Sequence, residues 1–151
     1  MIVKANVKYK DGTRGYEYFL VRFDHSPIKE TKKKHRRIGI CSIYYLTDDD
    51  SFEGGSPFSS TVCGDKFKYY LTYSKVQCHE KDNYVKAFTR IVTLQNAFKN
   101  IIALQRNNYI DWNFLLDNIS FKDFMNTLKE THSHGMETAF KLLQDPNYIT
   151  K

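Results

Sequence analysis

The sequence predicts an α+β fold, in which an antiparallel sheet of four or five strands in the N-terminal half is packed by a long helix and two shorter C-terminal helices. Hydrophobic residues recur with a period of two as far as about residue 76, and with a helical period after Lys81. Strands therefore precede helices instead of alternating with them, which is typical of α+β proteins. The length of 151 residues suits a single domain, residues 1–151, and the low counts of glycine (7) and proline (3) exclude collagen-like and low-complexity chains.

Four segments have the pattern of strands, and they cover residues 2–10, 16–24, 38–46 and 66–76, with residues 58–64 left open as a fifth strand. Val3, Ala5 and Val7 alternate with polar residues, so the first strand has one solvated face. The turn at residues 11–15 contains two glycines that can adopt positive φ, and it predicts a hairpin between the first two strands.

Three helices are expected in the C-terminal half. Apolar residues from Val85 to Ile102 predict a helix of about six turns, with Asp82 or Asn83 as its N-cap and Asn107-Asn108 as its end. Ser120 is expected to cap a second helix, whose apolar residues have helical spacing: Phe121, Phe124, Met125 and Leu128. A last helix, from Met136 to Gln144, is expected to end before Pro146.

The net charge of +6 is unevenly distributed along the chain. Residues 25–37 contain six cations and one anion, whereas residues 47–57 contain four anions and no cation. Dense lysine and arginine segments bind phosphate backbones because counterions are released on binding. We expect the basic segment to be functional, although a solubilising loop between two strands would have the same composition.

The motifs of common catalytic and metal sites are missing or incomplete. Neither GxxxxGK[ST] nor GxGxxG occurs, which excludes P-loop nucleotide hydrolysis. His132 and His134 resemble part of a zinc site, but we expect them in an exposed loop. Cys78 and His79 are adjacent, and neighbours in a strand point to opposite faces, which argues against a nucleophilic pair. We therefore predict that the protein is not an enzyme, needs no cofactor or metal, and keeps its three cysteines reduced.

Tyrosine is unusually frequent, with 11 residues, and some rings should reach the surface as contact or stacking groups. Seven candidates lie in the predicted strands, although a core of stacked aromatic rings would explain them equally well: Tyr16, Tyr18, Tyr44, Tyr45, Tyr69, Tyr70 and Tyr73.

The stretch from Cys78 to Arg90 resembles a pattern found in small, mostly uncharacterised bacteriophage accessory proteins. In that pattern a cysteine closes the last strand, a Lys-Asp-Asn-aromatic cap opens a helix, and basic residues follow one turn later. The matching residues are Cys78, Lys81, Asp82, Asn83, Tyr84, Lys86 and Arg90. Thr89 stands where the pattern usually has glycine, and of the alanine and arginine expected further on only Ala97 is present. The resemblance implies a viral origin and no particular activity.

We expect a phage-type accessory protein that binds and blocks a host macromolecule without catalysis, such as a host protein or ribonucleoprotein of a nucleic-acid-targeting defence complex. The alternative is a small basic module that binds nucleic acid through residues 25–37. The predicted binding residues are Lys29, Lys32, Lys33, Lys34, Arg36, Arg37, Lys86 and Arg90. No apolar run has the ~20 residues needed to cross a bilayer and no secretory signal is recognised, so we expect a location in the cytoplasm and no membrane partner.

Overall fold

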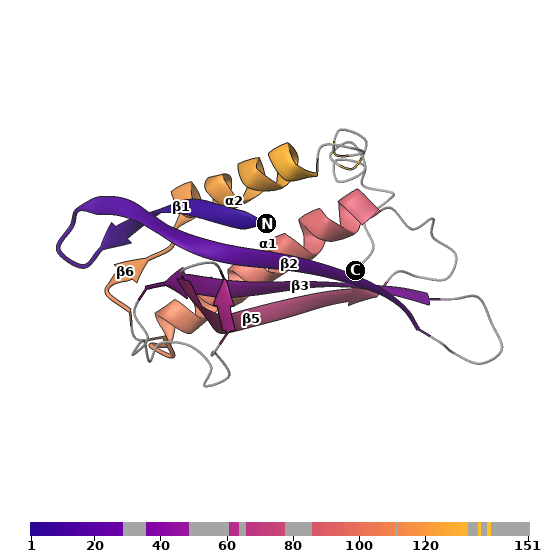
Figure 1. Ribbon diagram of the computed structural model, residues 1–151, viewed down its shortest axis with the longest axis horizontal. Helices are drawn as coiled ribbons and strands as arrows, with labels where there is room; N and C mark the ends of the chain where they lie inside the picture. The colour runs from indigo at the N-terminus through magenta and orange to yellow at the C-terminus, as the bar shows by residue number, and fades with distance from the viewer. Residues whose placement is uncertain are drawn as a thin grey trace.

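A computed structural model describes residues 1–28, 36–48, 61–63, 66–77, 86–110 and 112–132, together with Met136 and Ala139. Its strands are β1 (Ile2–Tyr9), β2 (Arg14–Ile28), β3 (Arg36–Thr47), β4 (Thr61–Cys63), β5 (Lys66–Gln77) and β6 (Phe114–Leu115), and its helices are α1 (Lys86–Arg106) and α2 (Asn118–Thr131). The strands form one antiparallel sheet in the order β4-β5-β3-β2-β1-β6, and the fold is α+β as predicted (Figure 1).

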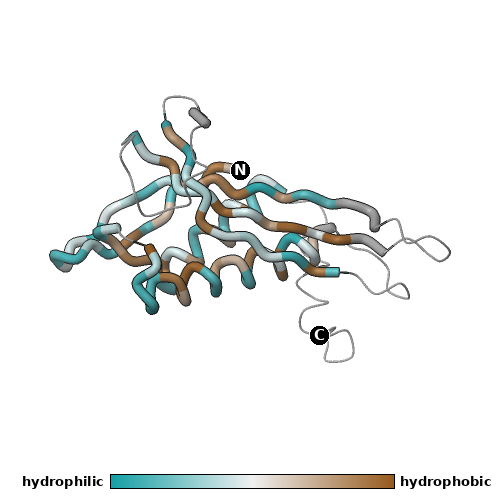
Figure 2. The backbone as a smooth tube through the Cα atoms, turned by 90° about the horizontal axis from the view of Figure 1, so that it is seen from below, coloured by the Kyte–Doolittle hydropathy of each residue, from teal (hydrophilic) through white to brown (hydrophobic). Residues whose placement is uncertain are grey.

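Both helices pack on one face of this sheet, where α1 lies against β3 and β5 and α2 lies against β1. Figure 2 shows α1 as a separate layer beside the long strands. No described helix covers the opposite face. We call the helix side the inner face of the sheet and the opposite side the outer face.

The predicted hairpin joins β1 to β2, with Ile2 opposite Leu20 and Lys8 opposite Arg14. Gly12 has a φ of +92°, which favours glycine, and the Tyr9 amide donates to the Thr13 carbonyl across the turn at 2.8 Å. Gly12 thus has the role that the sequence indicated, whereas Gly15 is part of β2, opposite Val7, and does not have a positive φ.

The core is built from the inner face. Phe19 of β2 lies at its centre and is fully buried, and four rings from β3, α2, β6 and the segment before β6 surround it: Tyr45, Trp112, Phe114 and Phe124. Their centroids lie 5.5–6.4 Å from that of Phe19, within the range of favourable edge and tilted contacts. Trp112 comes from the short segment that precedes β6 and is 6% exposed.

α1 approaches β3 closely at one point, where Thr89 faces Gly39. A Cβ atom on Gly39 would lie 1.9 Å from Cγ2 of Thr89, so only glycine fits at this position. At its other end, α1 stops before Asn108, which has a φ of +58° and is a residue type that tolerates this conformation, as predicted from the Asn107-Asn108 pair.

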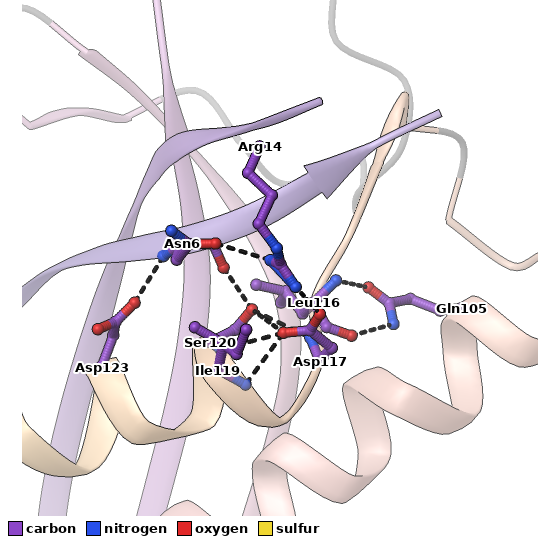
Figure 3. Close-up of polar contacts among 8 residues, drawn as sticks. All are labelled: Asn6, Arg14, Gln105, Leu116, Asp117, Ile119, Ser120 and Asp123. Carbon is purple, nitrogen blue, oxygen red and sulfur yellow. Dashed lines mark hydrogen bonds and ion pairs between the residues drawn. The ribbon is translucent and has the colours of Figure 1, made fainter. Parts of the chain in front are cut away.

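α2 is tied to the free edge of β1 (Figure 3). The Asn6 amide donates to the Asp123 carboxylate at 2.7 Å, and the Ser120 hydroxyl donates to the Asn6 carbonyl. Arg14 reaches across from β2, donating to the Asn6 side chain at 2.7 Å and pairing with Asp117. These contacts fix the orientation of α2 and occupy backbone groups of β1 that its short pairing with β6 leaves free.

The expected N-cap of α2 was wrong. Asp117 caps the helix, accepting from the amides of Ile119 and Ser120, while the Ser120 hydroxyl accepts from the Asp117 amide at 3.0 Å in a capping box. Ser120 is fully buried at the third helical position, where its hydroxyl also serves β1. In a capping box the N-cap residue and the residue at the third helical position bond each other reciprocally, and both can be serine or an acidic residue. The sequence alone therefore does not show which of Asp117 and Ser120 is the N-cap.

Two further details differ from the prediction. The sheet has six strands, because β4 lies within residues 58–64 and the two-residue β6 pairs with β1 at Lys8 and Tyr9. The described part of the chain contains two helices where three were expected. The third, Met136–Gln144, lies outside the described residues apart from Met136 and Ala139, which are both buried. No helix among the described residues is long and apolar enough to span a membrane.

The Gly39–Thr89 contact generates a stability prediction. Gly39→Ala should lower the free energy of unfolding by about 1–3 kcal/mol, because the added methyl group overlaps Cγ2 of a stiff β-branched side chain. Thr89→Ser removes that Cγ2 and keeps the hydroxyl, so the double variant should recover part of the loss in urea unfolding. If Gly39→Ala cost as much in the Thr89→Ser background as in the wild type, the two residues would not be in contact.

Candidate functional site

The structure places half of the predicted binding residues. Lys29, Lys32, Lys33 and Lys34 lie outside the described residues. Arg36 and Arg37 begin β3, opposite Ile28 and Pro27 of β2, and Lys86 is the first residue of α1. Because Gly39 contacts Thr89, the beginning of β3 and the beginning of α1 lie at the same end of the sheet.

Arg90 of α1 lies on the inner side of the sheet and is half-buried. Its Nε is buried and has no hydrogen-bond partner among the described residues. The guanidinium is close enough to His132, at the C-terminal end of α2, to affect its ionisation. Burial is the first cause of a lowered pKa for His132, and the charges of Arg90 and the Met1 amino group add to it. The imidazole also contacts the Phe23 ring, at 5.8 Å between centroids, and its Nδ1 atom lies 3.0 Å from the Thr131 hydroxyl oxygen.

The outer face of the sheet carries the most distinctive group of side chains. We call it the tyrosine–lysine face and define it by Lys4, Tyr16, Tyr18, Tyr44, Lys66, Lys68, Tyr70, Tyr73 and Lys75. Strand register places them together, because side chains of paired residues share a face: Tyr18 is opposite Lys4, Tyr44 is opposite Tyr70, and Lys75 is opposite Ile40.

Three ammonium groups of this face lie over tyrosine rings. The Nζ atom of Lys4 is 4.6 Å from the centre of the Tyr16 ring, that of Lys66 is 5.0 Å from Tyr18, and that of Lys68 is 4.8 Å from Tyr44. These distances are within the range of cation–π attraction. Each pair joins two strands, so ring and charge alternate across the sheet.

A cluster of three tyrosines continues the face towards β5. The rings of Tyr44 and Tyr70 are 5.7 Å apart, and Tyr73 is 52% exposed. Partial burial raises the pKa of Tyr70, and the neighbouring Tyr73 and Tyr44 phenols raise it further. The Tyr70 phenol therefore stays neutral at physiological pH. The rings of the cluster offer flat apolar surfaces together with hydroxyl groups that can form hydrogen bonds.

Acidic side chains on this face are few and engaged with neighbouring cations. Asp24 Oδ2 is 3.4 Å from the Arg22 Nε, and Asp48 Oδ1 is 3.5 Å from the Lys66 Nζ. Within the described part of the chain, lysines of the face therefore outnumber its carboxylates.

The structure divides the seven tyrosines singled out from the sequence. Tyr45 and Tyr69 are buried in the core, and the other five belong to the tyrosine–lysine face.

The Tyr45 hydroxyl donates to Glu17 at 2.6 Å, and the Tyr9 hydroxyl donates to the second oxygen of that carboxylate. Hydrogen bonding to Glu17, followed by burial, raises the pKa of Tyr9 to about 12. Sequence reasoning missed the lysine partners, because the pairing depends on register between strands.

Groups with reactive chemistry are sparse. Cys41 is buried, and burial raises the pKa of its thiol to about 12, so it is not a nucleophile at neutral pH. Among the described residues, no group of three histidine, cysteine, aspartate or glutamate side chains could hold a metal ion. Cys78, His79 and His134 lie outside those residues. What the described surface offers is binding by stacking, hydrogen bonds and positive charge.

Comparisons with protein-family models, with curated proteins and with solved structures found no match to this chain.

The two classes of tyrosine should differ in their contribution to stability. Tyr16→Ser and Tyr73→Ser should change the free energy of unfolding by no more than about 0.5 kcal/mol, because both rings are largely exposed. Tyr45→Phe should cost about 1.5–3 kcal/mol, because it removes a buried donor to the Glu17 carboxylate. Urea unfolding measures all three, and a loss for Tyr16→Ser as large as that for Tyr45→Phe would contradict the exposure of the Tyr16 ring.

His132 should make the protein less stable in acid. Its pKa is lowered from 6.5 in the folded state, so the unfolded chain takes up the proton first as the pH falls below 6.5, and stability is lost from there down to the folded pKa. Above pH 6.5 the group contributes no pH dependence. In urea unfolding at several pH values, His132→Gln should remove this part of the slope and Arg90→Gln should reduce it. Lys122→Gln, an exposed change on α2, should leave the slope unchanged.

Proposed function

We propose that the protein is a non-catalytic binding protein that holds single-stranded nucleic acid on its tyrosine–lysine face. The observation that carries the proposal is the alternation of tyrosine rings and ammonium groups across the sheet, with Lys–Tyr distances of 4.6–5.0 Å. Unpaired bases stack on aromatic side chains, and each nucleotide brings a phosphate beside its base. A surface that repeats ring and cation at short intervals matches both parts of the nucleotide.

The shape of the face favours a single strand over a duplex. Bases in a duplex are stacked on one another, and only their edges are accessible in the grooves. Reading those edges takes an α-helix or a two-stranded ribbon inserted into the groove, whereas the tyrosine–lysine face is the open side of a sheet of several strands. Stacking tolerates any base, so the proposed binding has little sequence preference.

A second candidate is the phage-type accessory protein that binds and blocks a host protein in the cytoplasm. The observation in its favour is the number of tyrosines on the same face, because tyrosine is enriched at protein–protein interfaces. Ile2, at 55% exposure, and Leu20 border the lysine–tyrosine pairs. Such a complex would have fixed stoichiometry and would survive nuclease treatment, whereas a complex bridged by nucleic acid would not.

Fluorescence anisotropy with a labelled oligothymidylate tests the first proposal. Tyr16→Ser and Tyr73→Ser should each weaken binding by about 1–3 kcal/mol, the usual contribution of one stacked base. The salt dependence should have a log–log slope of roughly −3, from about −0.7 for each phosphate neutralised by the four lysines of the face. The matched duplex should bind more weakly at every salt concentration.

Lys99→Gln and Lys122→Gln are the matched controls, since both remove an exposed lysine from the helix side and should leave affinity within about twofold of the wild type. Unchanged affinity in the face variants would reject the proposed site. If binding were lost instead when Lys32, Lys33, Lys34, Arg36 and Arg37 are replaced by serine, the binding surface would be the basic segment at residues 25–37.

A further inference from the structure

A groove runs between α1 and the start of α2, on the helix side of the molecule. Its first part has a volume of about 520 Å³, and it continues as a second hollow of about 480 Å³ towards β6. Ile102, Arg106 and Asn118 line both parts, so the two hollows form one groove. It is separate from the tyrosine–lysine face, because no residue of that face lines it.

The floor of this groove is apolar. At its base Phe98, which is 5% exposed, packs against the half-buried Phe121 with 5.0 Å between ring centroids, and the half-buried Ile102 lies beside them. Leu115 of β6 adds an aliphatic side chain that is 46% exposed. Apolar side chains left open in a groove are typical of binding surfaces, since covering them releases ordered water.

The charge along the groove is positive. Lys99 and Arg106 line the first part with no acidic side chain beside them, and Lys8 lines the second. The single carboxylate among the described lining residues is Asp117, which is already paired with Arg14. Neither Lys99 nor Arg106 has an ion pair within the described part of the chain. A ligand with carboxylates beside an apolar stripe therefore complements both the floor and the sides.

The geometry favours a helix over an extended strand as the occupant. Where the groove passes β6, the backbone of Leu116 is not free to pair with an added strand. The Gln105 side chain accepts from the Leu116 amide at 2.7 Å and donates to the Leu116 carbonyl at 3.0 Å. Recognition there depends on side chains. The lining residues of α1 run from Gln95 to Arg106, about 16 Å at 1.5 Å per residue, which matches three turns of a docked helix.

We propose that the groove between α1 and α2 binds an acidic amphipathic helix of a partner protein, with the apolar stripe of that helix on Phe98, Ile102 and Phe121 and its carboxylates beside Lys99 and Arg106. The protein then has two interfaces that share no lining residue. This interface does not depend on the nucleic-acid function proposed for the tyrosine–lysine face.

The test uses labelled synthetic peptides of about 14 residues, or four helical turns. The first has leucines at helical spacing and glutamates on both flanks, the second has lysines in place of the glutamates, and the third is a scrambled version of the first. Anisotropy titrations with the full chain should show binding of the acidic peptide, with affinity at least about tenfold higher than for either of the others. Equal binding of all three, or no binding of the acidic peptide, would overturn the proposal.

Charge reversal locates the site. The double variant Lys99→Glu/Arg106→Glu should weaken binding of the acidic peptide by about tenfold or more. Lys122→Glu/Lys129→Glu is the matched control, because it reverses two exposed cations of α2 that do not line the groove, and it should bind the peptide as the wild type does. Circular dichroism checks that both variants fold. Equal affinity of the two double variants would reject the groove as the site.

Two further measurements separate this inference from the nucleic-acid proposal. Tyr16→Ser/Tyr73→Ser should bind the acidic peptide with unchanged affinity, because neither tyrosine lines the groove. Oligothymidylate should not displace the peptide. Displacement that also requires Lys99 and Arg106 would mean that the groove binds nucleic acid, and the proposal of a helical protein partner would be wrong.

Discussion

The structure depends on the two-residue alternation along β1, β2, β3 and β5, which assigns one face of the sheet to the core and the other to solvent. Val3, Phe19, Tyr45 and Tyr69 form one row on the inner face, and the adjacent row on the outer face is Lys4, Tyr18, Leu46 and Lys68. Of these four outer residues only Leu46 is buried. A shift of one residue in any pairing would exchange the two rows for that strand, exposing aromatic rings and burying lysines. Register and core packing are therefore the same constraint, and the composition of the outer face follows from it.

Much of the fold could be predicted from local pattern, and the parts that could not depend on contacts between distant segments. The hairpin followed from its glycines, and the long helix from its apolar spacing and its Asn107-Asn108 end. The role of Ser120 could not be predicted, because its hydroxyl serves a carbonyl of β1 that is 114 residues away in the chain. Likewise, β6 is only two residues long, and it forms only through its pairing with Lys8 and Tyr9 of β1.

The candidate site shows the same limit. In each of the tyrosine pairs Tyr44-Tyr45 and Tyr69-Tyr70, one ring lies in the core and the other on the outer face. The sequence predicts that the two rings of a pair point to opposite faces, but it does not predict which one is buried. The pairing of β3 with β5 also shifts register between Ile43 and Tyr44, so alternation along β5 alone does not tell which of its side chains face the core. Arg90 illustrates the opposite case, since its position on α1 was predicted but its half-buried place near His132 depends on where α2 ends.

The burial of the single tryptophan has a practical consequence for spectroscopy. Trp112 packs against Phe19, Tyr45 and Phe114, and its indole Nε1 is buried with no hydrogen-bond partner among the described residues. An indole in such apolar surroundings emits at short wavelength and is shielded from aqueous quenchers, so its emission reports the integrity of the core. The tyrosines of the outer face emit separately and are open to quenching. Intrinsic fluorescence can thus distinguish loss of the fold from occupation of its surface without any added label.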